Sequence, residues 1–598
     1  MLIACRETQL CSQRESVFES IMRLSSSVPV VLQGLVLLSS FSRGDDEAFV
    51  RETTLGRIQG KVSKTLEDKE YLSFLGIPYA EAPVGHLRFK RPQPAKPWNG
   101  IFDGREEGPV CLQIPSFSEA GVVGDENCLS LSIFTPNLMA DQAAKPVIVW
   151  IHGGRFLVGS ASTNMYGPDY LIDQDVVVVN IQYRLGVFGF LSTEDEVAPG
   201  NYGLHDQTMA LQWIRDNIRQ FGGDPNQVTV MGHSAGGASS HSHLISPRSK
   251  GLFKNIIALS GTSNMGWASR FTFHDKVAVR QAKLFDCPTE PSQALVDCLR
   301  KVDAKELAAS ISDLHVFFKR TLAKIPLTPY TSRFDPESDS PFFPVDPREA
   351  LRTGQYDRSV PLLVGTTSQE GSWYMSTWYS KIFAQRLKEI DILNQEELVN
   401  FVAGEDLLRP GDWSKIVKHY FRNGKIADPS NRIAGSNFFS DITFNYETLH
   451  AAHLHTRSSD SPVYLYRFDY IGGWGYVSLF NETAQSFGGV AHLDDIRYLM
   501  RLPWAAPLST AEDKDMSKRF AGFMANFAKY GNPSSKTETW EPYVKGSGQY
   551  YKIASPDSSG MVRDIPFPKD RMNFIKIIYD AQEDITIDFK VNDAKEEL

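Results

Sequence analysis

A series of short apolar runs constrains the fold of this chain more than any other feature. The runs consist mainly of β-branched and other apolar residues, and they cover 147–151, 176–181, 228–231, 256–259, 360–364 and 463–466. Most are continuously apolar rather than alternating, which is typical of strands buried on both faces of a mostly parallel sheet. Helical or loop segments separate them, so the pattern predicts an α/β fold.

A helix is predicted between the second and third of these runs, over residues 206–221. Apolar residues recur near helical spacing from Met209 to Ile218, Asp206 is available as an N-cap, and the glycine-rich segment 222–225 ends the pattern. Such a helix would carry the chain from one parallel strand to the next.

One domain is the simplest division of the chain, because no internal repeat or low-complexity tract interrupts the pattern. We expect a single domain over residues 43–598, with its folded part between about 48 and 590. The proline and serine content of 332–347 predicts an excursion over the surface.

The first 42 residues resemble an extension followed by a signal peptide. Translation is expected to begin at Met22, which opens a positively charged start before the apolar stretch 28–38 and several small serines. A buried helix is the alternative. The apolar stretch has eleven residues, whereas a membrane span needs about 20, and no longer stretch follows. No transmembrane anchor is therefore predicted.

The last four residues, Lys595-Glu596-Glu597-Leu598, differ by one acidic substitution from the signal that retains soluble proteins in the endoplasmic reticulum. The ending could also arise by accident in an acidic tail. The two ends together predict the secretory pathway, with either the lumen of the endoplasmic reticulum or the extracellular space as the destination.

The charge of the chain excludes one class of partner. With 62 Lys and Arg against 71 Asp and Glu, the formal net charge is −9. No basic run carries interleaved aromatic residues, so a nucleic-acid backbone has little to attract it. No nucleic-acid partner, metal ion or cofactor is predicted.

Cysteine usage agrees with an oxidising compartment. Cys5 and Cys11 fall in the segment expected to be absent, and an even number remains: Cys111, Cys128, Cys287 and Cys298. Sequence alone leaves three pairings open, and pairing of neighbours would close two short loops. Asn481 lies in an Asn-Glu-Thr sequon, so we expect it to be a glycosylation site.

Ser234 is the candidate nucleophile. It is the centre of the pentapeptide Gly-His-Ser-Ala-Gly at 232–236, a pattern that would arise by chance roughly 0.25 times in a chain of this length. Its context is more specific, because a buried strand precedes it at 228–231 and a run of small residues follows from Ala235. This arrangement predicts a nucleophile elbow, with a glycine-rich turn before an ordinary helix as the alternative.

A serine nucleophile needs backbone N–H groups that stabilise the oxyanion formed after attack. Ala235 directly follows Ser234 and supplies one such group. The segment His152-Gly153-Gly154-Arg155-Phe156 follows the strand 147–151 and predicts the other donors. A plain turn is the alternative for this segment.

Candidates for the acid and the base follow Ser234 in the order expected for such a triad. Glu370 lies just after the run 360–364, where the carboxyl end of a strand would place it near the chemistry. His492 lies in the glycine-rich segment 488–495. Helical spacing in 446–456 instead predicts packed or surface positions for the other downstream histidines, namely His450, His453 and His455.

Several segments together resemble one known family, the type-B carboxylesterases, which include the cholinesterases. The matching segments are Gly-Ile-Pro-Tyr-Ala at 76–80, Glu-Asn-Cys-Leu-Ser-Leu at 126–131, Asn-Tyr-Gly-Leu-His-Asp-Gln at 201–207, Phe-Gly-Gly-Asp-Pro at 221–225 and Tyr-Leu-Tyr-Arg-Phe-Asp-Tyr at 464–470. The chain looks most like the invertebrate esterase branch. The resemblance implies an α/β-hydrolase fold, with a mostly parallel central sheet flanked by helices.

The resemblance also implies roles for individual residues. It places the nucleophile on Ser234, the acid on Glu370 and the base on His492, which agrees with the interpretation of the residues themselves. It places the oxyanion donors on the backbone N–H groups of Gly154, Arg155 and Ala235. It further implies disulfides between Cys111 and Cys128 and between Cys287 and Cys298.

Three departures from the family pattern affect the expected substrate. Arg155 stands where the family usually has a small residue, so its long cationic side chain is expected to narrow the acyl site or favour acidic substrates. The loop from Cys111 to Cys128 has no Trp to hold a quaternary ammonium by a cation–π contact. His233 replaces the Glu that precedes the cholinesterase nucleophile. Acetylcholine is therefore not the expected substrate.

The expected activity is hydrolysis of small carboxylic esters, hydrophobic or xenobiotic, through an acyl-enzyme intermediate. One alternative is a specialised esterase of the juvenile hormone type, because residues 489–495 resemble those enzymes around the base. Another is a catalytically impaired adhesion or scaffold protein with the same fold. The sequence leaves monomer and homo-oligomer open.

Overall fold

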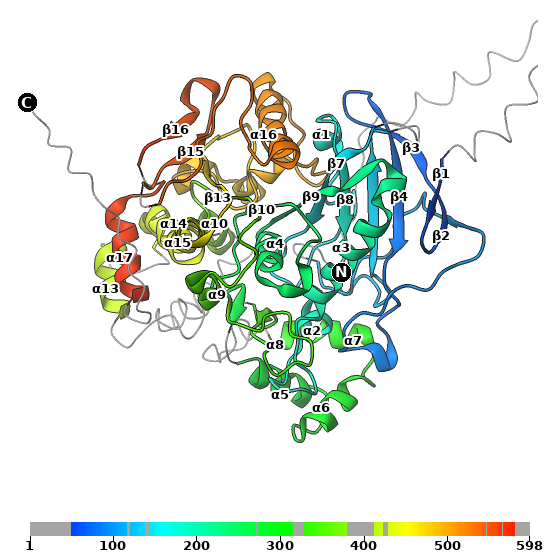
Figure 1. Cartoon of the computed structure of the whole chain (residues 1–598). Helices are drawn as coiled ribbons and strands as arrows, with labels where there is room; N and C mark the ends of the chain where they lie inside the picture. The colour runs from blue at the N-terminus through cyan, green and yellow to red at the C-terminus, as the bar shows by residue number, and fades with distance from the viewer. Residues whose placement is uncertain are drawn as a thin grey trace, which may run out of the picture. The chain divides into compact units, whose positions relative to one another are not determined.

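A mixed sheet forms the centre of the computed structural model (Figure 1). The structure describes residues 49–115, 120–137, 143–270, 273–314, 328–379, 412–421, 428–545, 547–564 and 566–580. Within these residues the sheet has eleven strands in the order β16-β15-β14-β13-β10-β9-β7-β8-β6-β4-β3. Contacts group the chain from Phe49 onward as one unit.

The strands run in chain order as β3 (Lys61–Lys64), β4 (Glu70–Pro78), β6 (Ser130–Thr135), β7 (Lys145–Ile151), β8 (Val177–Ile181), β9 (Gly223–His233), β10 (Asn255–Leu259), β13 (Leu362–Thr367), β14 (Val463–Phe468), β15 (Tyr550–Ile553) and β16 (Gly560–Val562). Each of the six predicted runs is a strand of this sheet. Every pair from β8 through β15 is parallel, whereas β3, β4, β6 and β16 pair antiparallel. The prediction of a mostly parallel sheet is confirmed.

Smaller sheets lie outside this one. One pairs β1 (Val50–Thr53), β2 (Gly56–Gln59) and β5 (Ile101–Asp103), and the other pairs β11 (Ser269–Arg270) with β12 (Ser332–Arg333).

Both faces of the central strands are buried, as their continuous apolar sequences predict. In β7, Val147 and Val149 belong to one hydrophobic core, whereas Ile148 and Trp150 belong to a second core on the opposite face. This division follows from the alternation of side chains along a strand. Burial on both faces requires helices on both sides of the sheet.

Helices cover the two faces. The first core includes residues of α3 (Tyr202–Asn217), α4 (Ala235–Ile245) and α15 (Tyr446–Ser458). The second includes residues of α1 (Asp169–Ile172) and α16 (Ala511–Tyr530). Within the described residues, the other α-helices are α2 (Gly186–Phe190), α5 (His274–Lys283), α6 (Ser292–Leu299), α7 (Ala304–Ala309), α8 (Ile311–Leu314), α9 (Pro347–Thr353), α10 (Ser372–Tyr379), α13 (Asp412–Tyr420), α14 (Arg432–Ser440) and α17 (Lys569–Asp580).

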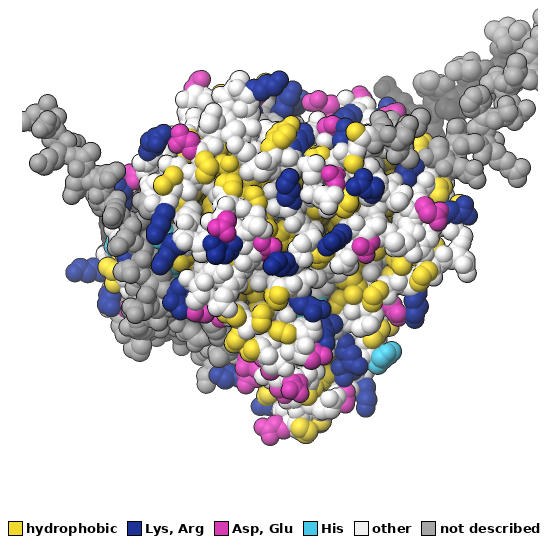
Figure 2. All heavy atoms as spheres, viewed as in Figure 1, with side chains coloured by type: hydrophobic (Ala, Val, Ile, Leu, Met, Phe, Trp, Pro, Cys, Tyr) yellow, Lys and Arg dark blue, Asp and Glu magenta, His cyan; other side chains and the backbone are white. Residues whose placement is uncertain are grey.

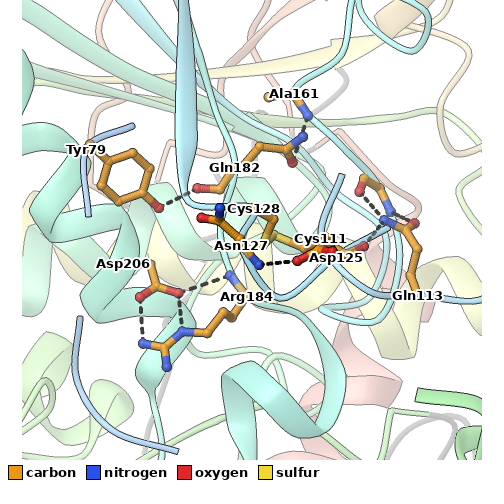
Figure 3. Close-up of a disulfide and its surroundings, with 11 residues drawn as sticks. Tyr79, Cys111, Gln113, Asp125, Asn127, Cys128, Ala161, Gln182, Arg184 and Asp206 are labelled. Atoms are coloured by element: carbon orange, nitrogen blue, oxygen red, sulfur yellow. Dashed lines mark hydrogen bonds and ion pairs between the residues drawn. A yellow bond between two sulfur atoms is a disulfide. The ribbon is translucent and has the colours of Figure 1, made fainter. Parts of the chain in front are cut away.

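The predicted crossover helix exists, but its predicted start is wrong. Helix α3 begins at Tyr202 after Asn201, which has a left-handed backbone with φ 58°, and a short 3-10 turn carries the chain on to Phe221. Asp206 therefore lies inside the helix rather than at its N-cap. It is fully buried and accepts hydrogen bonds from Arg184 Nε at 2.8 Å and Nη2 at 2.7 Å (Figure 3).

We expect the Arg184–Asp206 pair to matter for stability. Replacing Asp206 by Ala leaves the buried Arg184 guanidinium without its counter-charge, which should lower the free energy of unfolding by about 3–5 kcal/mol. The measurement is urea unfolding followed by tryptophan fluorescence. Asp216→Ala is the matched control, because Asp216 lies on the same helix but is exposed. Equal unfolding midpoints for the two variants would contradict this role.

The predicted surface excursion at 332–347 is confirmed only in part, because Pro336, Asp339 and Pro344 are exposed whereas other residues of the segment are buried. Phe342 and Phe343 are fully buried, and the Asp335 carboxylate accepts hydrogen bonds from both of their backbone N–H groups. Ser246 donates a hydrogen bond to Phe342 O at 2.7 Å. The two phenylalanines are thus part of the packed interior beside α4.

The remaining predictions about the ends of the chain lie outside the described residues. These are the extension and signal peptide at 1–42, with Cys5, Cys11 and Met22, and the tail at 595–598. Within the described part, no helix combines the length and apolarity that crossing a bilayer requires. On the face shown in Figure 2, Lys and Arg side chains of the described residues are scattered among acidic and apolar ones.

Candidate active site

Ser234 lies in the sharp turn between β9 and α4, as the pattern predicts. Its backbone has φ 58° and ψ −122°, a conformation that is strained for a residue with a side chain. Small neighbours permit the turn, since a Cβ atom on Gly232 would lie 2.3 Å from Gly236 O. The Ser234 N–H donates to Leu259 O at 2.8 Å, which ties the turn to strand β10.

The loop after β7 packs directly against Ser234. A Cβ atom added to Gly153 would lie 3.1 Å from Ser234 Cβ and 2.6 Å from His233 O, so only glycine allows this approach. The Tyr183 hydroxyl donates a hydrogen bond to His152 O at 2.8 Å, and the two rings stack at 4.5 Å. Burial lowers the pKa of His152 to about 4. The start of this loop is thus held beside the serine by a neutral, fully buried histidine.

Backbone N–H groups near Ser234 are available to a ligand. Among the described residues, no acceptor takes the N–H of Gly154, Arg155 or Ala235. Ala235 is the first residue of α4, where N–H groups have no partner within the helix. Gly154 has φ 113° and Arg155 has φ 58°, so the chain turns sharply at these two positions. The three groups have the character that oxyanion donors require.

Glu370 and His492 are in direct contact. Glu370 follows β13 in the turn before α10, and its Oε2 lies 2.5 Å from His492 Nδ1. His492 lies in the loop 488–495, as predicted, and its ring lies 4.5 Å from the ring of His233, the residue before the nucleophile. The structure therefore brings the candidate acid and base into direct contact, and it places the base against the residue that precedes the candidate nucleophile.

The second oxygen of Glu370 is held by neighbours that sequence reasoning missed. Its Oε1 accepts hydrogen bonds from the Ser260 hydroxyl at 2.6 Å and from the Thr367 N–H at 2.7 Å. Ser260 directly follows β10, so the same strand-end rule that selected Glu370 could have found it. These bonds fix the orientation of the carboxylate that faces His492.

Aromatic side chains surround the His492 ring. The Phe444 ring lies 4.7 Å away and the Trp373 ring 6.0 Å away. Phe444 belongs to a π-helical turn at Asp441–Asn445 between α14 and α15. Single π-turns are frequent at functional sites. The surroundings of the base are therefore largely apolar.

One histidine and two acids next to the candidate triad are buried, namely His233, Asp494 and Asp495. Burial, followed by the charge of His492, lowers the pKa of His233 well below its ordinary value. Asp495 is 4.0 Å from His233, and burial followed by the charge of Glu370 raises the pKa of this acid well above its ordinary value. Burial raises the pKa of Asp494 to about 7. His233 is thus neutral, so this position carries no anion.

The other downstream histidines lie in the predicted helix α15 and are buried. His455 Nε2 lies 2.8 Å from Nε2 of His241 on α4, and burial lowers the pKa of both rings. His450 lies 3.5 Å from Glu447 on its own helix. No described contact joins these residues to Ser234.

Two disulfides join Cys111 to Cys128 and Cys287 to Cys298, the pairing that the resemblance implies. The first lies beside the loop that carries Arg184, as Figure 3 shows. Asn481 of the predicted sequon is exposed. Among the described residues, no group of His, Cys, Asp and Glu is arranged to hold a metal ion.

A family model and several known esterases match this chain. Residues 47–568 match the model of the carboxylesterase family. The chain is 36% identical to juvenile hormone esterase of Tribolium castaneum over 501 residues, which cover 80% of this chain and 83% of that protein. It is 35% identical to esterase FE4 of Myzus persicae, over 83% of this chain and 87% of that protein.

A mammalian relative and a solved structure extend the comparison. Acylcarnitine hydrolase of Mus musculus is 34% identical over 87% of this chain and 90% of that protein. The crystal structure of juvenile hormone esterase from Manduca sexta, with OTFP covalently attached, matches with a TM-score of 0.79 and 28% identity. The match covers 89% of this chain and 99% of that one.

Proposed function

Since this chain belongs to the carboxylesterase family, we propose that Ser234, Glu370 and His492 are its catalytic triad. The protein is a serine hydrolase of carboxylic esters, with the α/β-hydrolase fold of its relatives. The observation that carries the assignment of residues is the contact between Glu370 Oε2 and His492 Nδ1, with His233 of the nucleophile elbow against the same histidine.

The mechanism follows from these positions. His492 accepts the hydroxyl proton of Ser234 as the oxygen attacks the ester carbonyl, and the N–H groups of Gly154, Arg155 and Ala235 stabilise the oxyanion. The alcohol leaves with the proton from His492. Water then hydrolyses the acyl-enzyme by the same steps, while Glu370 keeps the imidazole oriented and stabilises its cation.

The substrates that we propose are small hydrophobic or xenobiotic esters. The apolar rings of Phe444 and Trp373 beside His492 support this choice. The neutral His233 supports the exclusion of choline esters, because no anion stands at that position. An ester of the juvenile hormone type is the second candidate, favoured by the two relatives that carry that name.

We further propose that the protein enters the secretory pathway. The two disulfides favour an oxidising compartment, and the exposed position of Asn481 is accessible to glycosylation.

Ester turnover by the purified protein tests the function. We expect hydrolysis of p-nitrophenyl butyrate, and we expect one equivalent of an organophosphate to abolish it, because a single activated serine reacts with both. The control is protein unfolded in urea before the organophosphate is added, which should remain unlabelled. Absence of both turnover and labelling would instead favour the scaffold alternative.

A further inference from the structure

The side chain of Arg155 has an unusual setting for a cation. It extends from the loop that packs against Ser234, is partly buried, and is desolvated enough to lower its pKa. Among the described residues, no Asp or Glu pairs with its guanidinium, and no oxygen accepts a hydrogen bond from it. Its guanidinium lies over the ring of Trp373, whose centroid is 5.9 Å from Arg155 Cζ.

Other arginines in the interior have carboxylate partners. Arg184 pairs with Asp206 at 2.7 Å, Arg88 with Glu126 at 2.6 Å, and Arg571 with Asp441 at 2.6 Å. Partial burial of a charge costs free energy unless an opposite charge compensates it. Arg155 has no such compensation within the described residues, so an anion bound there would be stabilised.

The guanidinium and the proposed base share one neighbour, the Trp373 ring. Trp373, on which the guanidinium lies, is 6.0 Å from the His492 ring. The positive charge of Arg155 also acts on the hydroxyl groups of Tyr374 and Tyr476, which means that both lie near it. One aromatic ring and two phenol groups therefore lie near the charge, and the same ring lies near the proposed base.

The backbone of Arg155 sets how far a bound anion would be from the ester. Its N–H is one of the proposed oxyanion donors, so the carbonyl oxygen and the guanidinium are no farther apart than one arginine side chain can span. An anion carried by the acyl part of the substrate, a few bonds from the carbonyl carbon, would fall within this reach.

We propose that Arg155 forms an anion-binding subsite, and that the enzyme favours esters whose acyl part carries a carboxylate. Half-esters of short dicarboxylic acids are the simplest substrates of this class. The proposal rests on the proposed function, since it uses the oxyanion role of the Arg155 N–H. It deepens that function by naming a substrate class that an apolar acyl site alone would reject.

The test compares p-nitrophenyl hemiadipate with the neutral p-nitrophenyl ester of monomethyl adipate. The measured quantity is the ratio of kcat/KM for the anionic ester to that for the neutral one. In Arg155→Met we expect this ratio to fall about tenfold or more, because a charge-assisted contact is lost. Methionine keeps an unbranched apolar stem and the backbone N–H, and dividing by the neutral rate removes any effect on the oxyanion donor.

Two further variants and a change in salt concentration test whether the charge of Arg155 sets this ratio. Arg155→Lys should restore part of the ratio, because it keeps the charge but not the two-pronged geometry. Arg352→Met removes an exposed arginine on α9 and should leave the ratio unchanged. High salt should lower the ratio for the wild type but not for Arg155→Met.

The outcomes separate the subsite from the activity itself. If Arg155→Met hydrolyses the neutral ester and keeps the wild-type ratio, the subsite does not exist while the esterase assignment stands. If the wild type turns over neither ester and no organophosphate labels it, the proposed function fails instead.

Discussion

Replacing Ser234 by Ala is expected to reduce kcat for p-nitrophenyl butyrate by about 10⁴-fold or more. The side chain of Ser234 supplies the only atom that forms the acyl-enzyme, so its removal leaves just the modest catalysis that substrate binding and the oxyanion donors provide. Alanine also fits the turn, because the strain there arises from the backbone at φ 58°. The fold should therefore be retained.

Ser242→Ala is the matched control for this variant. Ser242 is buried on α4, and its hydroxyl donates a hydrogen bond to Ala238 O within the helix at 2.7 Å. We expect wild-type kcat from it. Steady-state kinetics and thermal unfolding midpoints of both variants form the measurement. Substantial turnover by Ser234→Ala with an unchanged midpoint would show that another residue is the nucleophile.

Glu370→Gln is the second large effect, with an expected loss in kcat of about 10³- to 10⁴-fold. Glutamine has the same shape, and its amide oxygen can still accept from Ser260 and Thr367 N–H, which hold Oε1 at 2.6 and 2.7 Å. The amide NH₂ group would then face His492 Nδ1 and favour the tautomer with the proton on Nε2. That tautomer cannot accept the proton of Ser234.

The size of the loss in kcat shows whether Glu370 orients His492 or only packs against it. Glu349→Gln, on the exposed surface of α9, is the control and should be neutral. KM for Glu370→Gln should change much less than kcat, because the carboxylate does not touch the substrate. A variant with near wild-type kcat would mean that Glu370 does not set the state of His492.

The central sheet was predictable because its strands are buried on both faces. Such strands need no polar positions, so runs like 176–181 and 256–259 stand out from the rest of the chain. Edge strands give a weaker signal. In β3, every residue from Lys61 to Lys64 is exposed or partly exposed, and its pairing with β4 is the only reason that it is a strand.

Predictions from the local sequence were wrong where contacts with residues far away in the chain determine the structure. Asp206 satisfies the sequence rule for an N-cap, but its carboxylate is held inside α3 by Arg184, 22 residues earlier. The segment 332–347 has the composition of a surface loop, but Phe342 and Phe343 within it are buried and pack beside helix α4. Neither partner can be found from the local sequence.

The candidate site was predictable residue by residue, but its supporting contacts were not. Strand ends and glycine-rich turns mark Ser234, Glu370 and His492 in the sequence. Ser260 acts on Glu370 from 110 residues away, and no local pattern joins the two. That no described carboxylate pairs with Arg155 is likewise visible only when its neighbours in space are known.

The residue that carries the organophosphate shows directly whether Ser234 is the nucleophile. After treatment with one equivalent and digestion, mass spectrometry of the peptides locates the added phosphoryl group. We expect the peptide containing Ser234 to carry it, labelling and loss of turnover to proceed together, and Ser234→Ala to take up none. A label on another residue that accompanies the loss of turnover would contradict this assignment.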